Sequence, residues 1–333
     1  MMKWKKTAVV LLSTILLAAC GSKTSTPSSS GGQANNGESK KKTYNIGVTQ
    51  IVEHPSLDAA FEGFKKAIEE GGIKAKYNIQ NAQGDNSTNT TIATNLVNSK
   101  VDLIFANSTP SAQAAASQTK DIPIVFTSVT DPIGAKLVSS MENPGANITG
   151  TIDTHPDAIP NTLKFMKEKL NMTKVGMVYN SGEQNSRAQV DNVKKLASGI
   201  GLKIVEASVA TSADVKQATE SLVGKVDGFY IISDNTVVSA LESVISVANK
   251  NKLPMMAAEF DSVRKGALGA YGFEYYDIGY EAGQMAVKIL KGESKPSDLP
   301  VQVPQNLKLV INKKTANTIG IDIKDDWNAE TTE

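Results

Sequence analysis

Hydroxyl and amide side chains follow two apolar runs in the first half of the chain, at residues 101–106 and 122–127. These side chains are Asn107, Ser108, Thr109, Ser128 and Thr130. A hydroxyl in front of a helix caps free backbone N–H groups, and such N–H groups bind carboxylates and phosphates. We therefore expect an anion-binding cluster, with a ligand's carboxylate on Ser108, Thr109 and Ser128. The alternative is that each hydroxyl only caps a helix or forms a turn.

Carboxylates take the corresponding positions in the second half of the chain. Glu183, Asp234 and Glu259 each follow a separate apolar run. Polar neighbours extend this set by Asn185, Ser186 and Asn235. Carboxylates that face hydroxyls across a cleft suit a zwitterion, so we expect the ligand's ammonium on Asp234 with help from Glu183. The structural alternatives are an N-cap for Asp234 and a solvated turn residue for Glu259.

Two polar residues near the end of the first apolar run, Gln50 and His54, are also predicted to contact a ligand. Gln50 ends the run, and His54 lies in the loop that follows it. His54 has a competing interpretation, since a lone histidine is more often structural or solvated. The other histidine, His155, is given no role.

The chain shows none of the common enzyme motifs. It lacks a G-x-G-x-x-G after the first strand, a Walker A loop, a G-x-S-x-G elbow and an H-E-x-x-H pair. Two histidines and one cysteine are too few for a histidine or thiolate metal site, so we expect no metal, no cofactor and no enzyme activity. Glu183 and Asp234 could in principle pair as glycosidase carboxylates, but nothing around them favours that chemistry. A net charge of +1 gives no field that would attract nucleic acid.

The elements that must position these residues are strands alternating with helices. From Tyr44 onward, short apolar runs alternate with amphipathic segments, which predicts βαβ units with parallel sheets. The pattern repeats, since Val101-Asp102 recurs as Val226-Asp227 and Ile122-Pro123 as Leu253-Pro254. The repeat predicts an α/β fold of two similar Rossmann-like lobes, which bind ligands at the carboxyl ends of their strands. Strands are expected at 45–49, 74–79, 101–106, 122–127, 174–179, 203–207, 226–232, 253–258 and 307–312, and helices at 57–70, 87–99, 111–120, 186–198, 213–222, 236–249, 275–291 and 313–318.

The first residues of the chain form a secretory signal. Residues 1–19 combine a basic head with an apolar core that is shorter than the roughly 20 residues of a membrane-spanning helix. The sequence Leu17-Ala18-Ala19-Cys20 resembles a bacterial lipobox, which implies cleavage before Cys20 and lipid attachment to it. The alternative is an ordinary signal peptide with an incidental cysteine. Residues 20–43 are therefore predicted to be a lipidated cysteine and a flexible linker rich in Ser, Gly, Asn and Lys.

Several short motifs together point to a known family. In order along residues 44–322 they are His54-Pro55-Ser56-Leu57-Asp58-Ala59-Ala60, Asn81-Ala82-Gln83-Gly84-Asp85, Val129-Thr130-Asp131-Pro132, Asn147-Ile148-Thr149-Gly150, Glu183-Gln184-Asn185-Ser186 and Asp234-Asn235. Together these motifs resemble the ABC-transporter substrate-binding lipoproteins of the tryptophan/tyrosine-type uptake systems. The resemblance implies the type I periplasmic-binding fold, in which two lobes close on a ligand about a three-strand hinge. The strands of the hinge are expected near Gly150, Phe273 and Gln305. The implied lobe boundaries are 44–150 plus 275–304 for the N-lobe and 151–274 plus 305–327 for the C-lobe.

The resemblance also implies a function. The protein is expected to capture an aromatic amino acid, tryptophan first of all, and to deliver it to an ABC permease and its ATPase. The ring of the ligand is expected against Phe260 or Tyr179. The protein is expected to be a monomer that its lipid holds on the extracytoplasmic face of the cell membrane.

Three other functions remain open at this point. The same fold could bind a sugar or nucleoside, although an aromatic content of 5% is low for the stacking that sugars need. An extracytoplasmic hydrolase would need a nucleophile–base pair or a metal set, and only scattered carboxylates are present. A repressor-like sensor of the same fold would need a DNA-reading helix pair where this chain carries a signal peptide.

Overall fold

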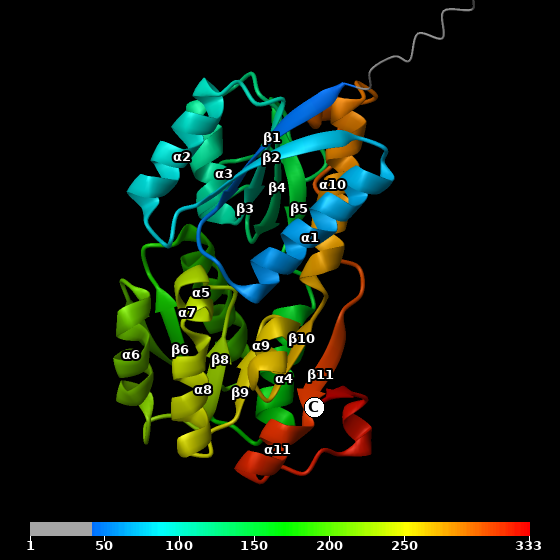
Figure 1. Ribbon diagram of the computed structural model, residues 1–333. Helices are drawn as coiled ribbons and strands as arrows, with labels where there is room; N and C mark the ends of the chain where they lie inside the picture. The colour runs from blue at the N-terminus through cyan, green and yellow to red at the C-terminus, as the bar shows by residue number, and fades with distance from the viewer. Residues whose placement is uncertain (1–41) are drawn as a thin grey trace, which may run out of the picture. The chain divides into compact units, whose positions relative to one another are not determined.

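The computed structural model describes residues 42–333, which form two α/β lobes (Figure 1). The predicted signal peptide, Cys20 and the linker up to residue 41 lie outside the described residues. Within the described range, no helix combines the length and apolar character needed to cross a membrane.

The first sheet is entirely parallel, with the strand order β2-β1-β3-β4-β5. Its strands are β1 (Thr43–Gln50), β2 (Lys74–Asn81), β3 (Leu103–Asn107), β4 (Ile124–Val129) and β5 (Ile148–Ile152). Its helices are α1 (Pro55–Glu70), α2 (Asn86–Asn98), α3 (Thr109–Gln118) and, from much later in the chain, α10 (Tyr275–Leu290). Strands β3 and β4 are buried along their whole length, which explains their continuous apolar runs.

The second sheet has the order β12-β11-β10-β9-β8-β6-β7, and only the pair β10 and β11 is antiparallel. Its strands are β6 (Lys174–Asn180), β7 (Lys203–Val209), β8 (Gly228–Ile231), β9 (Met255–Ala257), β10 (Gly269–Gly272), β11 (Lys308–Asn312) and β12 (Glu330–Thr332). Its helices are α4 (Ala158–Glu168), α5 (Gln184–Gly199), α6 (Val215–Leu222), α7 (Asn235–Ser239), α8 (Leu241–Lys250), α9 (Phe260–Lys265) and α11 (Lys313–Ile319). Short 3₁₀ helices lie at Ser212–Asp214, Pro296–Asp298 and Asp325–Trp327.

The chain passes between the two sheets three times. It leaves the first sheet after β5, returns between β10 and α10, and leaves again before β11. The first and third passages pair with each other, because Gln302 N–H donates to the Gly150 carbonyl at 3.0 Å and Ile152 N–H donates to the Gln302 carbonyl at 3.0 Å. The predicted fold class, two parallel-sheet lobes joined by a three-strand hinge, is confirmed.

Helix α10 returns to the first lobe and lies against α1 (Figure 1). The two backbones touch at Gly279, where an added Cβ would stand 1.8 Å from the Ala60 carbonyl oxygen. Only glycine permits this approach, which fixes α10 on the lobe. The contact also fixes Tyr275, the first residue of α10, at the point where the chain arrives from the second lobe.

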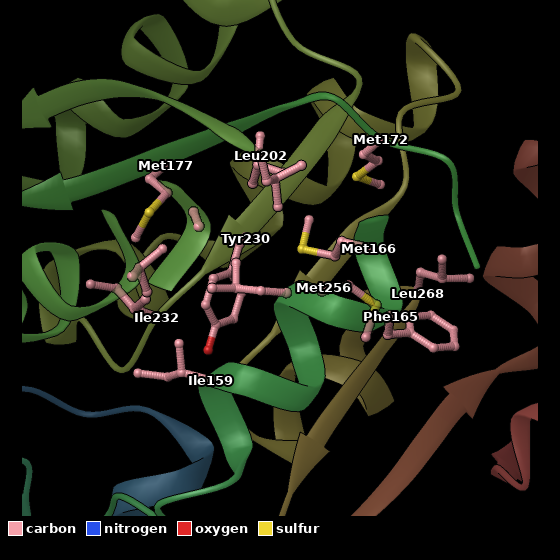
Figure 2. Packing of buried hydrophobic residues seen from close by; sticks show 14 of the residues in the cluster. Ile159, Phe165, Met166, Met172, Met177, Leu202, Tyr230, Ile232, Met256 and Leu268 are labelled. Atoms are coloured by element: carbon pink, nitrogen blue, oxygen red, sulfur yellow. The ribbon is translucent and has the colours of Figure 1, made fainter. Parts of the chain in front are cut away.

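The second lobe has its own apolar core. Figure 2 shows part of it around Tyr230, with Met166, Met256 and Leu268 among its neighbours. Tyr230 is 1% exposed, and burial raises the pKa of its hydroxyl. The core is closed at the C-terminal end by Trp327, whose ring packs edge-on against Phe165 at a centroid distance of 4.9 Å.

Two kinds of local prediction were wrong. The expected helix at 236–249 is two helices, α7 and α8, which part at Ala240 (φ −112°, ψ 22°). Residues 236–238 are all β-branched, and such side chains lose rotational freedom in a helix, so a long helix is poorly supported there. Elements β5, α4, α9, β10 and β12 were not expected. Most of them are too short to show a clear hydrophobic period. Helix α4 contains Pro160, which usually argues against a helix, but Pro160 lies in the first turn, where the missing N–H costs little.

Candidate functional site

A cavity between the lobes collects residues from both sheets and from the crossing strands. It is lined by His54, Leu57, Ser128, Asp153, Ser233, Asp234, Asn235, Val238, Glu259 and Tyr275. The carboxyl ends of strands β4 and β8 supply part of this set, as expected for parallel α/β lobes. The loops before α1 and α9 supply His54 and Glu259.

All the polar residues predicted to contact a ligand are buried. The ones that line the cavity are His54, Ser128, Asp234, Asn235 and Glu259. The ones that are buried elsewhere are Gln50, Asn107, Ser108, Thr109, Thr130, Glu183, Asn185 and Ser186. The second group lies behind or beside the first, and its hydrogen bonds indicate what it does.

In the first lobe, amide groups support Ser128. The Asn107 side-chain NH₂ donates to Gln50 Oε1 at 3.0 Å and to the Leu57 carbonyl at 2.7 Å. The Ser128 hydroxyl donates to Asn107 Oδ1 at 3.0 Å. Ser128 has a φ of +56°, a left-handed conformation that costs free energy and is often held at functional sites. Gln50 and Asn107 therefore hold Ser128 in place instead of lining the cavity themselves.

The other predicted hydroxyls of the first lobe have structural partners. Ser108 Oγ accepts from the Ser111 N–H at 3.4 Å and caps α3. Thr109 Oγ1 accepts from the Thr130 N–H at 3.3 Å and ties two strand ends together. Of the expected carboxylate-binding trio, the structure brings only Ser128 to the cavity.

Asp234 is buried completely and has several donors from its own lobe. Its Oδ1 accepts from the Val237 N–H at 2.8 Å, so it is the N-cap of α7. Its Oδ2 accepts from the Asn180 N–H and from the Ser186 hydroxyl, both at 2.6 Å. Burial, and then the nearby Glu183 carboxylate, raise the pKa of Asp234 to about 7. The N-cap that was weighed as an alternative is therefore present, on a side chain that also lines the cavity.

Glu183 does not line the central cavity. Its carboxylate accepts hydrogen bonds from the second lobe alone, from Asn185, Asn235 and Thr236. The shortest joins Asn235 Nδ2 to Glu183 Oε2 at 2.6 Å. Its role in the structure is to hold Asn235, which does line the cavity.

Glu259 is 3% exposed, so the alternative of a solvated turn residue is wrong. It caps α9, where Oε2 accepts from the Ser262 N–H at 2.9 Å and Oε1 accepts from the Ser262 hydroxyl. Glu259 Oε2 also accepts from the Ser56 hydroxyl of α1 at 2.9 Å, a bond from one lobe to the other. Burial raises the pKa of the Glu259 carboxyl.

Five cavity residues were not predicted as ligand contacts: Leu57, Asp153, Ser233, Val238 and Tyr275. A hydrogen bond joins two of them, Asp153 and Tyr275. The Tyr275 hydroxyl donates to Asp153 Oδ2 at 2.9 Å and lies 3.4 Å from Ser233 Oγ. Asp153 Oδ1 accepts from the Thr130 hydroxyl at 2.9 Å. Burial raises the pKa of Asp153, and it raises that of Tyr275 well above the usual tyrosine range. Asp153 directly follows β5, so recognition of that strand would have marked it as a strand-end carboxylate.

The aromatic residues expected beside the ligand do not line the cavity. Phe260 is 2% exposed and packs in the core of the second lobe. The Tyr179 hydroxyl donates to Glu206 of β7 at 3.0 Å. The aromatic side chain that lines the cavity is Tyr275, which stacks on Phe273 with ring centroids 5.8 Å apart.

The cavity wall carries carboxylates without a matching cation. Asp153, Asp234 and Glu259 line it, and no lysine or arginine of the described residues 42–333 does. His54 is buried and neutral at pH 7, because burial and the charge of Lys265 lower its pKa to about 3. Among residues 42–333, no group of His, Cys, Asp and Glu side chains is arranged to hold a metal ion. The site is therefore suited to a compact organic cation or zwitterion.

Comparison with known proteins places the chain in a family. Residues 45–333 match the family model described as ABC transporter substrate binding protein. A tyrosine-binding protein of Clostridioides difficile (strain R20291) is 44% identical over 310 residues, which cover 89% of each chain. The crystal structure of the ABC domain in complex with L-Trp from Streptococcus pneumoniae is 34% identical with a TM-score of 0.83, over 87% of this chain and 100% of that one.

A second solved structure, in an open and ligand-free state, is also similar to this chain. The ligand-free, open structure of a substrate binding protein with adhesive properties from Clostridium difficile is 43% identical, over 87% of this chain and 99% of that one. Its TM-score is 0.65, which is lower than the 0.83 of the L-Trp complex, although the L-Trp complex has the lower sequence identity. The chain superposes better on the L-Trp complex than on the ligand-free, open structure, and the Ser56–Glu259 bond joins its two lobes. The fold, the lobe arrangement and the match over nearly all described residues lead to one assignment: this chain belongs to the ABC transporter substrate-binding proteins.

Proposed function

We propose that this protein captures an aromatic amino acid between its lobes and delivers it to an ABC permease. Membership of the substrate-binding family supplies the transport role. The tyrosine-binding relative and the relative with bound L-Trp support an aromatic amino acid as the ligand. Tryptophan and tyrosine are the first ligands to test.

The observation that carries this proposal is that three carboxyl groups line the cavity and no lysine or arginine among residues 42–333 does. A buried carboxylate without a partner is costly, and a ligand ammonium compensates that cost. The carboxylate of the ligand needs neutral donors, and Ser128, Ser233 and Asn235 offer hydroxyl and amide groups in the same cavity. An amino acid carries both groups on one carbon, which fits a wall with both kinds of partner.

The apolar part of the wall suits the side chain of the ligand. Leu57 and Val238 line the cavity from opposite lobes, and Tyr275 lines it at the start of α10. An aromatic ring buries a large apolar area and gains from contact with another ring in offset or edge geometry. The Tyr275–Phe273 stack provides such a surface.

Binding requires the lobes to move. The cavity has room for only about one water molecule. An amino acid therefore enters when the lobes or the lining side chains move apart, and it stabilises the closed state by its contacts with both lobes. The three crossing strands provide the hinge for this motion.

We further propose that the protein is a monomer anchored outside the cytoplasm through a lipid on Cys20. The lipobox-like Leu17-Ala18-Ala19-Cys20 and the polar residues 20–43 support the lipid anchor. A flexible tether would keep the lobes close to the permease at a high effective concentration.

A thermal-shift screen tests the proposed ligand class. The purified protein is heated with each of the twenty amino acids, with nucleosides and with sugars. A ligand at 100 times its Kd adds about 2.7 kcal/mol to the free energy of unfolding. Shifts for tryptophan, tyrosine or phenylalanine alone support the proposal. A shift only for a sugar or nucleoside would contradict it.

A further inference from the structure

We propose that Asp153, held in place by the hydroxyl of Tyr275, is the residue that binds the ammonium of the ligand and selects amines. This inference rests on the proposed function, and it replaces Asp234 as the expected ammonium partner. Three carboxylates line the cavity, so the question is which of them keeps free acceptor positions.

Asp234 and Glu259 have most of their acceptor positions occupied by structural donors. Asp234 accepts three hydrogen bonds, from the Asn180 and Val237 N–H groups and the Ser186 hydroxyl. Glu259 also accepts three, from the Ser56 hydroxyl and from the N–H and hydroxyl of Ser262. Each of them caps a helix, a role that needs the carboxylate whether or not a ligand is bound.

Asp153 has no capping role and accepts two short hydrogen bonds, while the Ser233 hydroxyl also stabilises its charged form. Asp153 accepts one hydrogen bond on each oxygen, from Thr130 and from Tyr275, both at 2.9 Å. An ionised carboxylate offers about four lone-pair positions, so each Asp153 oxygen keeps one free for a donor. Asp153 is 8% exposed and has no lysine or arginine partner among the described ion pairs. A ligand ammonium provides both the donors and the charge that it lacks.

The position of Asp153 in the fold links amine binding to closure. Asp153 follows β5 on the first crossing, and Tyr275 ends the second crossing at the start of α10. The Thr130 hydroxyl that contacts Asp153 also accepts from Gln189 of the second lobe at 3.4 Å. The Tyr275 hydroxyl lies 3.4 Å from Ser233, which follows β8 of that lobe. An ammonium on Asp153 would therefore sit where both lobes and two crossing strands meet.

The test compares ligands with and without the amine. Titration calorimetry measures the affinities of two pairs of ligands, and the members of each pair differ by the α-amino group. The first pair is L-tryptophan and indole-3-propionate, and the second is L-tyrosine and 3-(4-hydroxyphenyl)propionate. In the unsubstituted protein, loss of the amine should weaken binding at least about 30-fold, as for a buried charge pair that loses one partner. In Asp153→Asn, binding of the amino acid should fall by a similar factor, and the two members of each pair should bind within about threefold of each other.

Asp234→Asn and Glu259→Gln are the matched controls. Each removes one cavity carboxylate at nearly constant volume, and each should keep at least about a tenfold preference for the amine even where overall affinity falls. Retention of the full preference in Asp153→Asn, or its loss in Asp234→Asn, would overturn the assignment.

Circular dichroism checks that each variant folds. If Asp153→Asn does not fold, the two controls still decide the question, because the preference must then survive in both of them. Failure of the unsubstituted protein to bind tryptophan, tyrosine and phenylalanine would instead refute the proposed function. That outcome is distinct from binding with the wrong amine partner.

Discussion

The Ser56 hydroxyl donates a hydrogen bond to the Glu259 carboxylate at 2.9 Å and joins the start of α1 in one lobe to the start of α9 in the other. Both side chains are buried, with 0% and 3% of their surfaces exposed. Because Ser56 and Glu259 belong to different lobes, this bond is broken when the lobes part. It therefore contributes to the closed state alone.

Substitution of Ser56 by alanine should weaken ligand binding. The loss of one hydrogen bond to a buried carboxylate costs about 1–2 kcal/mol, which predicts an affinity about 5- to 30-fold lower by calorimetry. Small-angle scattering should show a larger radius of gyration for the ligand-free variant. Ser262→Ala is the matched control, since Ser262 donates to the same carboxylate from within the second lobe. The control should lower the free energy of unfolding without changing the radius of gyration, and an equal change in both variants would contradict a role in closure.

The stability of the protein should depend on pH through His54. Its pKa is about 3 in the folded protein against an ordinary value of 6.5, so between these pH values only the unfolded chain takes up the proton. The stabilisation is present above pH 6.5 and is lost as the pH falls toward 3. In His54→Asn, which keeps an N-cap acceptor for α1, the fall in the free energy of unfolding from pH 6.5 to pH 5 should be smaller by about 2 kcal/mol.

Asp234 should affect the pH dependence of the free energy of unfolding with the opposite sign. Its pKa is about 7 in the folded protein against 3.8 ordinarily, so its contribution is present below pH 3.8 and is lost as the pH rises through 7. Asp234→Asn should therefore show a steeper loss of stability between pH 6.5 and pH 4 than the unsubstituted protein in urea titrations. If the free energy of unfolding followed the same pH profile in His54→Asn and Asp234→Asn, both assignments would be contradicted.

The contact between α1 and α10 should be sensitive to a single methyl group. An added Cβ at Gly279 would stand 1.8 Å from the Ala60 carbonyl oxygen, so Gly279→Ala must push the helices apart. We expect a loss of at least about 2 kcal/mol in the free energy of unfolding, measured with urea, because overpacking costs this much even without a backbone clash. Gly199→Ala is the control, since a Cβ there meets nothing within 4 Å. Equal stability of the two variants would show that α10 does not pack as described.

The anchor should be separable from the binding lobes. Cys20→Ala should abolish incorporation of labelled palmitate and release the protein into the soluble fraction, while its affinity for the ligand stays within about twofold. Ser22→Ala, two residues further on, should remain on the membrane. A Cys20→Ala protein that stays with the lipid fraction would contradict lipid attachment at this residue.

The sequence predicted which strand ends form the site better than it predicted which side chains line the cavity. Strand ends rich in polar residues were expected to meet, and all the polar residues predicted as ligand contacts are buried. Which of them face the cavity was not predictable, because a cap and a ligand contact need the same chemistry. Ser108 and Ser128 are both hydroxyls at strand ends, yet the first caps α3 and the second lines the cavity.

The omission of Asp153 has a specific physical cause. It follows β5, a strand whose sequence is interrupted by Gly150. Glycine normally weakens a strand pattern, but here a Cβ would stand 2.0 Å from the Phe126 carbonyl oxygen of β4, so the close approach requires it. Tyr275 was expected only as part of a helix. The orientation of the Tyr275 side chain depends on where α10 packs. That packing is determined by contacts between segments far apart in the sequence.

The central claim is that the cavity between the lobes binds an aromatic amino acid, and titration calorimetry on the purified protein tests it most directly. L-tryptophan, L-tyrosine and L-phenylalanine are titrated in turn, with L-leucine, glucose and adenosine as comparisons. The account predicts saturable one-site binding of at least one aromatic amino acid, at least about tenfold tighter than that of any comparison ligand. No heat with any aromatic amino acid, together with saturable binding of glucose or adenosine, would contradict it.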